Sequence, residues 1–252
     1  MTRFSLEGKI ALITGASRGI GEAVALACAE QGAECILASR KAEALEGVVK
    51  KIEAAGGKAS ACAANMGDLE QIAGLFEFIR EKFGKLDILV NNAATNPYFG
   101  NMTEAPEWAW DKTLAVNLKG PFFATQEAAK LMDAAGGGAI VNVASINGIK
   151  PAPLQGIYSI TKAGLISMTK GFAKELAAKK IRVNALLPGL TKTDFSKALF
   201  EMEEIRQHVI AEIPLQRHAE PHEMAGAVIY LVSDASSFTT GICITCDGGY
   251  LA

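Results

Sequence analysis

The chain has 252 residues; 50% are apolar and 21% are charged, with 25 basic against 27 acidic side chains. This composition is that of a globular protein, and the near-neutral charge balance provides no basic surface for nucleic acid or an anionic membrane. No apolar stretch approaches the roughly 20 residues of a membrane span, and the first residues contain no apolar signal core. We therefore expect a cytoplasmic enzyme that contacts neither nucleic acid nor membrane.

Short apolar runs alternate along the chain with longer segments of helical period. The runs predict strands at residues 10–14, 35–39, 59–63, 88–91, 139–143, 182–186 and 242–245. The segments between them predict helices at 20–31, 42–54, 69–82, 107–133, 156–179 and 222–232, with a kink or break near Pro121. The runs lack the polar alternation of a half-exposed sheet, so helices should cover both faces. The pattern predicts an α/β fold: one doubly wound, Rossmann-type, three-layer domain over residues 1–252, with a seven-stranded parallel sheet.

A glycine-rich turn directly follows the first strand and opens the first helix. Gly15 permits the sharp turn, Gly19 lets the backbone approach a pyrophosphate, and Gly21 lets helix and strand pack closely. The helix N-terminal amides behind the turn can bind phosphate. This context predicts a dinucleotide site, although the spacing is G-x-x-x-G-x-G rather than G-x-G-x-x-G.

The end of the second strand bears on which dinucleotide is bound. An acidic residue about 20 positions past the glycines binds the ribose 2′-hydroxyl of NAD. Here the strand ends in Ser39 and Arg40 with no carboxylate in place. The guanidinium groups of Arg40 and Arg18 suit a 2′-phosphate, and Ser39 can add a hydroxyl. We expect NADP(H) to be preferred, with NAD(H) possible if Arg40 is only a solvated loop residue.

The five cysteines and three histidines predict no metal site and no disulfide framework. Cys243 and Cys246 form a C-x-x-C, but they lie in an apolar, β-branched run that reads as a strand. His218 and His222 are four apart, yet Pro221 lies between them. We expect free thiols that pack as small apolar groups.

Tyr158 and Lys162 are spaced by four residues on a predicted helix, so both side chains point the same way. Alone, this pair is a weak signal that also fits an ordinary surface pair. Here it follows a strand that ends at Ser145 and lies downstream of the phosphate turn. Together these features resemble the short-chain dehydrogenase/reductase family, in its subgroup of about 250 residues. The similarity extends over the whole chain.

The resemblance implies a catalytic tetrad of Asn117, Ser145, Tyr158 and Lys162. Tyr158 would exchange a proton with the substrate oxygen while the nicotinamide exchanges a hydride. A nearby Lys162 cation would favour the phenolate and also grip the nicotinamide ribose. Ser145 would orient the substrate oxygen, and Asn117 would hold a water that links Lys162 to solvent.

The resemblance also implies further cofactor contacts after the third, fourth and sixth strands. With the turn itself, the implied cofactor-binding residues are Gly15, Ser17, Arg18, Gly19, Ile20, Gly21, Ser39, Arg40, Asn65, Met66, Asn91, Ala93, Tyr158, Lys162, Pro188, Gly189, Leu190, Thr191 and Thr193. Asn65 replaces a common aspartate of the family, but its side-chain oxygen can still accept from an adenine amino group.

The segment 191–213 resembles the family's mobile substrate lid, although its apolar residues would also suit ordinary helix packing. These residues are Phe195, Leu199, Phe200, Met202 and Ile205. Expected substrate contacts are Ser145, Asn147, Tyr158, Tyr98, Leu154 and Phe195. Local similarity points to an NADPH-dependent carbonyl reductase branch, with a small carbonyl or secondary alcohol as the substrate, whose identity the sequence does not give.

Other functions fit parts of this pattern. An NAD-dependent alcohol dehydrogenase of the same family and a non-catalytic dinucleotide-binding regulator remain open. A nucleotide-sugar epimerase or dehydratase also uses Tyr and Lys, but such chains carry a further substrate domain. The helices at 107–133 and 156–179 are longer and more apolar than one face of a sheet should need. The resemblance implies that they pair with other copies of the chain in a homotetramer, with a dimer as the alternative.

Overall fold

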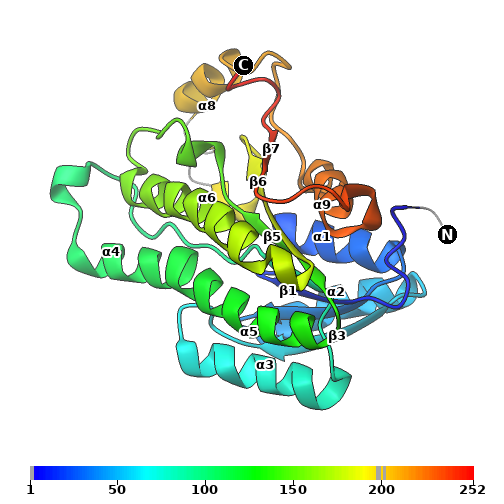
Figure 1. The fold of residues 1–252 in the computed structure, drawn as a ribbon. Helices are drawn as coiled ribbons and strands as arrows, with labels where there is room; N and C mark the ends of the chain where they lie inside the picture. The colour runs from blue at the N-terminus through cyan, green and yellow to red at the C-terminus, as the bar shows by residue number, and fades with distance from the viewer. Residues whose placement is uncertain (1–2, 197–199, 201–202) are drawn as a thin grey trace.

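The computed structural model describes residues 3–196, 200 and 203–252 and contains one seven-stranded parallel sheet (Figure 1). The strands are β1 (Ile10–Thr14), β2 (Glu34–Ser39), β3 (Lys58–Ala63), β4 (Ile88–Asn91), β5 (Gly138–Val143), β6 (Ile181–Pro188) and β7 (Cys243–Cys246). Their spatial order is β3-β2-β1-β4-β5-β6-β7, and every neighbouring pair is parallel. The predicted fold class and strand count are confirmed. The order reverses between β1 and β4, which is where ligands bind in such sheets.

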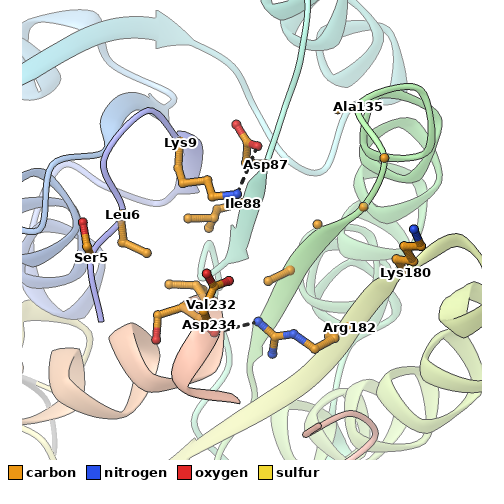
Figure 2. A pocket seen from close by; sticks show the side chains of 15 residues that line it. Ser5, Leu6, Lys9, Asp87, Ile88, Ala135, Lys180, Arg182, Val232 and Asp234 are labelled. Atoms are coloured by element: carbon orange, nitrogen blue, oxygen red, sulfur yellow. Dashed lines mark hydrogen bonds and ion pairs between the residues drawn. The ribbon is translucent and has the colours of Figure 1, made fainter. Parts of the chain in front are cut away.

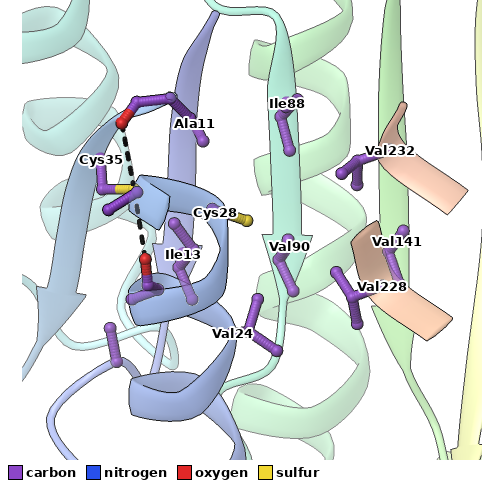
Figure 3. Packing of buried hydrophobic residues seen from close by; sticks show 14 of the residues in the cluster. Ala11, Ile13, Val24, Cys28, Cys35, Ile88, Val90, Val141, Val228 and Val232 are labelled. Atoms are coloured by element: carbon purple, nitrogen blue, oxygen red, sulfur yellow. Dashed lines mark hydrogen bonds between the residues drawn. The ribbon is translucent and has the colours of Figure 1, made fainter. Parts of the chain in front are cut away.

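Helices pack on both faces of the sheet. The α-helices are α1 (Gly19–Glu30), α2 (Ala42–Ala54), α3 (Leu69–Phe83), α4 (Glu107–Leu114), α5 (Gly120–Ala134), α6 (Gly156–Leu176), α8 (Glu203–Ala211) and α9 (Ala225–Val232). Helices α1, α2 and α9 share a buried apolar cluster with one face of the sheet, and α3, α5 and α6 share another with the opposite face. Figure 3 shows the first cluster, where Val24 of α1 and Val228 of α9 lie over Val90. Alternate residues of β1 enter the two clusters, as the sequence pattern predicts.

The helix predicted at 107–133 is interrupted where the sequence contains Pro121. Between α4 and α5 lies a π-helical segment, Ala115–Lys119, in which the Gly120 N–H donates to the Ala115 carbonyl five residues before it. Pro121 has no N–H to give to the carbonyl of Asn117, four residues before it, so the α-helical pattern cannot continue there. π-Helical segments are rare in proteins, and those that do occur are often at functional sites.

The remaining connections use short 3-10 turns. The turns that bear on the site are η3 (Ile146–Gly148), η5 (Asp194–Ser196) and η6 (Pro221–Met224). Within the described residues, every helix is too short or too polar to cross a membrane.

Candidate active site

The predicted proton-transfer residues meet at the carboxyl edge of the sheet. Ser145 lies two residues after the end of β5, whereas Tyr158 and Lys162 lie one turn apart in the first half of α6. The Lys162 Nζ lies 5.4 Å from the centre of the Tyr158 ring, and the Ser145 hydroxyl lies close enough to Tyr158 to lower its pKa. The three side chains are buried, between 2% and 9% exposed. The structure therefore brings Ser145, Tyr158 and Lys162 together in one desolvated group.

Burial controls the protonation of this group. It raises the pKa of Tyr158 to about 12, although the neighbouring Ser145 hydroxyl opposes the shift. Burial also lowers the pKa of Lys162 to about 7, because the ammonium is removed from water. The Lys162 Nζ donates to the Val143 carbonyl at 2.7 Å. Burial has the larger effect on the Tyr158 pKa, and the expected lowering of that pKa by a Lys162 cation stays a prediction.

Asn117 lies in the π-helical segment and is completely buried. Its Oδ1 accepts from the Thr95 amide at 2.8 Å, and its Nδ2 donates to the Thr95 carbonyl at 2.9 Å and to the Thr161 hydroxyl at 3.2 Å. Asn117 thus joins the loop after β4 to the turn of α6 between Tyr158 and Lys162. The side-chain amide holds protein groups, so a relay water would have to use the main-chain carbonyl, which the Pro121 ring leaves without an α-helical donor.

The glycine-rich turn forms a cradle beside this group. Gly15 has φ +65°, and a Cβ there would lie 2.9 Å from the Cα of Ala93. At Gly21, a Cβ would collide with the Gly15 carbonyl and the Asn92 amide. Arg18, the N-cap residue of α1, makes no side-chain capping bond, so the first amides of the helix remain available to an anion. These features fit a dinucleotide pyrophosphate.

Asn92 is a residue of this cradle that the sequence argument overlooks. Its Nδ2 donates to the carbonyls of Thr14 at 2.9 Å and Gly15 at 3.2 Å, which fixes the turn. Its neighbour Asn91, a predicted cofactor contact, is instead buried and donates to Thr125 and Asn142. Asn91 therefore joins β4 to β5 and α5, and its role toward a cofactor would be indirect.

The groups expected around the adenosine half lie at the end of β2 and in the glycine-rich turn. Ser39 ends β2, and its hydroxyl donates to the Lys41 carbonyl at 3.3 Å. Arg18 pairs with Asp194 of η5 at 3.0 Å, with both side chains about two-thirds exposed. Such an exposed pair contributes little, so a phosphate could displace it. In the described part of the chain, no carboxylate pairs with Arg40.

Two further predicted adenosine contacts follow β3. The Asn65 Oδ1 already accepts from the Gly67 amide at 3.1 Å, which leaves one lone pair for an adenine amino group. The neighbouring Met66 side chain is buried, at 4% exposure. The structure thus keeps both residues beside the end of β3.

The loop after β6 lies against the glycine-rich turn. A Cβ at Gly19 would lie 3.2 Å from the Thr193 Cγ2, which places that threonine at the phosphate cradle. Thr191 is buried and bridges to Ala219. This arrangement fits the predicted contacts from Pro188 to Thr193.

Among the predicted substrate contacts, Phe195 is the one that packs against Tyr158. The Phe195 ring lies 5.5 Å from the Tyr158 ring, so the segment 191–213 does reach the catalytic group. Leu199 and Met202 fall outside the described residues. The Tyr98 hydroxyl donates to the Asn101 carbonyl, and Leu154 is exposed with φ +64°. Tyr98 and Leu154 therefore stay predictions.

Asn147 and its partners form a polar side of the site. The Asn147 backbone N–H donates to the Ser145 hydroxyl at 3.1 Å. Its side-chain amide lies 3.5 Å from Gln155, a residue that the sequence argument did not select. The signal available for Gln155 was its place three residues before Tyr158, one helical turn away.

A separate cavity of about 240 Å³ lies at the opposite, amino edge of the sheet (Figure 2). Lys9, Asp87 and Arg182 are among its lining residues. The Arg182 guanidinium donates to the carbonyls of Leu231 and Ser233, so its role is to close the end of α9. The catalytic side chains lie at the other edge, and this cavity is not the candidate site.

In the described ranges, no group of three potential metal ligands gathers, and the five cysteines are free thiols. Cys243 packs toward one face of the sheet and Cys246 toward the other. The pair therefore does not present two ligands to one site.

Comparison with known proteins assigns this arrangement. The profile of the family described as Enoyl-(Acyl carrier protein) reductase matches residues 15–251. The curated 3-oxoacyl-[acyl-carrier-protein] reductase FabG of Thermotoga maritima is 42% identical over 97% of this chain and 98% of its own. The crystal structure of a short-chain type dehydrogenase/reductase from Mycobacterium marinum is 37% identical, covers 98% of this chain and 97% of its own, and has a TM-score of 0.93. The chain belongs to the short-chain dehydrogenase/reductase family.

A further member illustrates the range of the short-chain dehydrogenase/reductase family. The structure of a gluconate 5-dehydrogenase from Burkholderia cenocepacia, in complex with NADP and tartrate, is 31% identical. It covers 99% of this chain and 97% of its own, with a TM-score of 0.95. The family resemblance is confirmed. The carbonyl reductase branch stays a prediction, because these relatives carry other activities in their names.

Proposed function

We propose that this protein is an NADP(H)-dependent oxidoreductase that interconverts a small ketone and a secondary alcohol. The observation that carries the proposal is the buried group of Ser145, Tyr158 and Lys162 beside the glycine cradle of α1. When bound, the nicotinamide supplies or accepts the hydride. The gluconate 5-dehydrogenase that binds NADP supports this cofactor class.

The proton chemistry follows from the side chains of this chain. The Ser145 hydroxyl and the Tyr158 phenol are neighbours, so both could reach one carbonyl oxygen. In reduction, Tyr158 gives its proton to the oxygen as negative charge develops there, while Ser145 donates a second hydrogen bond. Lys162 holds the Val143 carbonyl and stands behind the phenol, where its ammonium form would stabilise the phenolate left after the transfer.

The preference for NADP(H) rests on the groups around the end of β2. No carboxylate follows Ser39 at the position that would accept from a ribose 2′-hydroxyl. Arg40 is exposed, and Arg18 lies across the cradle in a weak exposed pair with Asp194. Both guanidinium groups can therefore turn to a 2′-phosphate.

The proposal is tested by following reduced-cofactor absorbance with a panel of ketones and alcohols. Net turnover is expected for the unmodified protein, and Tyr158→Phe should lose at least about a hundredfold in kcat with cofactor affinity retained. Tyr230→Phe is the matched control, because Tyr230 lies on α9 and its hydroxyl contacts the Thr239 hydroxyl at 3.2 Å. Tight cofactor binding without turnover on any substrate would instead favour a non-catalytic regulator.

A homotetramer is part of the proposal. Large apolar side chains are exposed on the helices of one side, among them Trp108 and Trp110 of α4, Phe122 of α5 and Ile160 of α6. Exposed apolar groups in such numbers favour association between copies of the chain. The free thiols support the expected reducing compartment, the cytoplasm.

A further inference from the structure

Three carboxamide side chains gather beside the catalytic group, and proton transfer does not require them. Asn96 lies in the loop after β4, Asn147 in η3, and Gln155 at the N-cap of α6. The Gln155 Oε1 accepts from the Nδ2 of Asn96 at 3.4 Å and from the Nδ2 of Asn147 at 3.5 Å. We refer to Asn96, Asn147 and Gln155 as the amide cluster.

The amide cluster is attached to the residues that would hold the reacting oxygen. The Asn147 N–H donates to the Ser145 hydroxyl at 3.1 Å. The Gln155 carbonyl accepts from the Ser159 amide at 2.9 Å and from its hydroxyl at 2.8 Å, within the turn that carries Tyr158. A carbonyl held by Ser145 and Tyr158 therefore has one substituent next to the cluster.

The hydrogen-bonding capacity of the cluster is only partly used. The two contacts of Gln155 are at the long limit of hydrogen-bond distance, so each is weak. Among the residues that the structure describes, none bonds to the Gln155 Nε2, the Asn96 Oδ1 or the Asn147 Oδ1. All three side chains are half-buried. They can thus offer both donors and acceptors to a bound molecule.

The charge around the amide cluster indicates which kind of substrate group it would bind. The amide cluster carries no charge, and the cation nearest to it in sequence, Lys150, is paired with Glu212 at 3.2 Å. On the other side of Tyr158 lies the apolar ring of Phe195. Neutral groups that both donate and accept suit hydroxyls better than a carboxylate or an ammonium group.

We infer that the substrate is a hydroxy ketone, with a hydroxyl on the carbon next to its carbonyl, or the vicinal diol formed by its reduction, and that the amide cluster selects for this hydroxyl. The inference rests on the proposed function. It assigns Gln155 a specificity role, because this side chain contacts both other members of the cluster.

The test compares acetoin with butanone, which differ only in a hydroxyl next to the carbonyl, at saturating NADPH. One or two neutral hydrogen bonds predict a kcat/KM for acetoin about tenfold higher than for butanone. Gln155→Leu should reduce this ratio to about one. Gln126→Leu, on the exposed side of α5, is the matched control and should preserve the ratio. Asn96→Ala is a second variant of the cluster and should lower the ratio likewise.

The outcomes separate this inference from the proposed function. If the unmodified protein reduces butanone as well as acetoin, the hydroxyl selection is wrong and the reductase activity stands. If Gln155→Leu and Asn96→Ala lower kcat/KM equally for acetoin and for butanone, the cluster is merely structural and the inference is also wrong. If neither these ketones nor any other panel member is reduced, the proposed function fails, and the selection fails with it.

Discussion

Replacing Lys162 with methionine should make the protein more stable and, at the same time, inactive. Lys162 is 2% exposed, and burial lowers its pKa from 10.5 to about 7. The unfolded chain binds a proton at this side chain throughout the range below its ordinary pKa, whereas the folded chain does so only below about pH 7. Folding is therefore opposed as the pH falls from 10.5 to 7.

The magnitude follows from the shift. At about 1.4 kcal/mol per pKa unit, the native state is destabilised by about 4 kcal/mol at pH 7. Methionine has a similar length and no charge, but it loses the bond to the Val143 carbonyl, which is worth about 1 kcal/mol. The free energy of unfolding of Lys162→Met should therefore be about 3 kcal/mol higher at pH 7, which corresponds to roughly 6–12 °C in Tm for a chain of this size. The gain should disappear near pH 10.5, where the lysine is neutral in the folded state and about half neutral in the unfolded state, so that little of the burial penalty remains.

The assay is thermal or urea unfolding of the cofactor-free protein at pH 7 and near pH 10.5, at one protein concentration because assembly makes Tm concentration-dependent. Lys170→Met, an exposed lysine on the same helix, is the control and should change stability little at either pH. Turnover and cofactor affinity of Lys162→Met should both fall. A variant that is less stable than the unmodified protein at pH 7, or whose gain does not depend on pH, would refute the burial argument.

The other predictions concern pH, cofactor and assembly. Because the pKa of Tyr158 is raised to about 12, the phenolate fraction grows about tenfold per pH unit below that value. The kcat of alcohol oxidation should therefore rise up to at least about pH 10, while the kcat of ketone reduction stays level near neutrality. An oxidation kcat that does not depend on pH would contradict this. Calorimetry should show at least about tenfold tighter binding of NADPH than of NADH, and Arg40→Asp should reverse this preference. Equal affinities for the two cofactors would contradict the assignment of Arg40 to the 2′-phosphate. Light scattering should give four times the chain mass, and exchanging Trp108 and Trp110 for glutamate should lower it; a monomer in the unmodified protein would exclude the tetramer.

The sequence by itself determined the sheet and the position of the catalytic group. Apolar strands and helical periods are local patterns, and seven such runs leave few ways to bury their faces other than a parallel sheet between helix layers. The carboxyl ends of parallel strands meet at one edge, so Ser145 after β5 and the helix pair Tyr158 and Lys162 could be brought together from spacing alone. The interruption near Pro121 was likewise readable, because a missing N–H is a property of one residue.

Only the tertiary structure decided the protonation and the polar contacts of the site. A pKa depends on burial and on neighbours distant in sequence, and here burial raises the pKa of Tyr158 and lowers the pKa of Lys162. The same holds for Asn117, whose amide bonds the backbone of Thr95, and for Gln155, whose partners come from two other loops. Hydrogen bonds between segments depend on distances of a few tenths of an ångström, and these are fixed only when the layers pack.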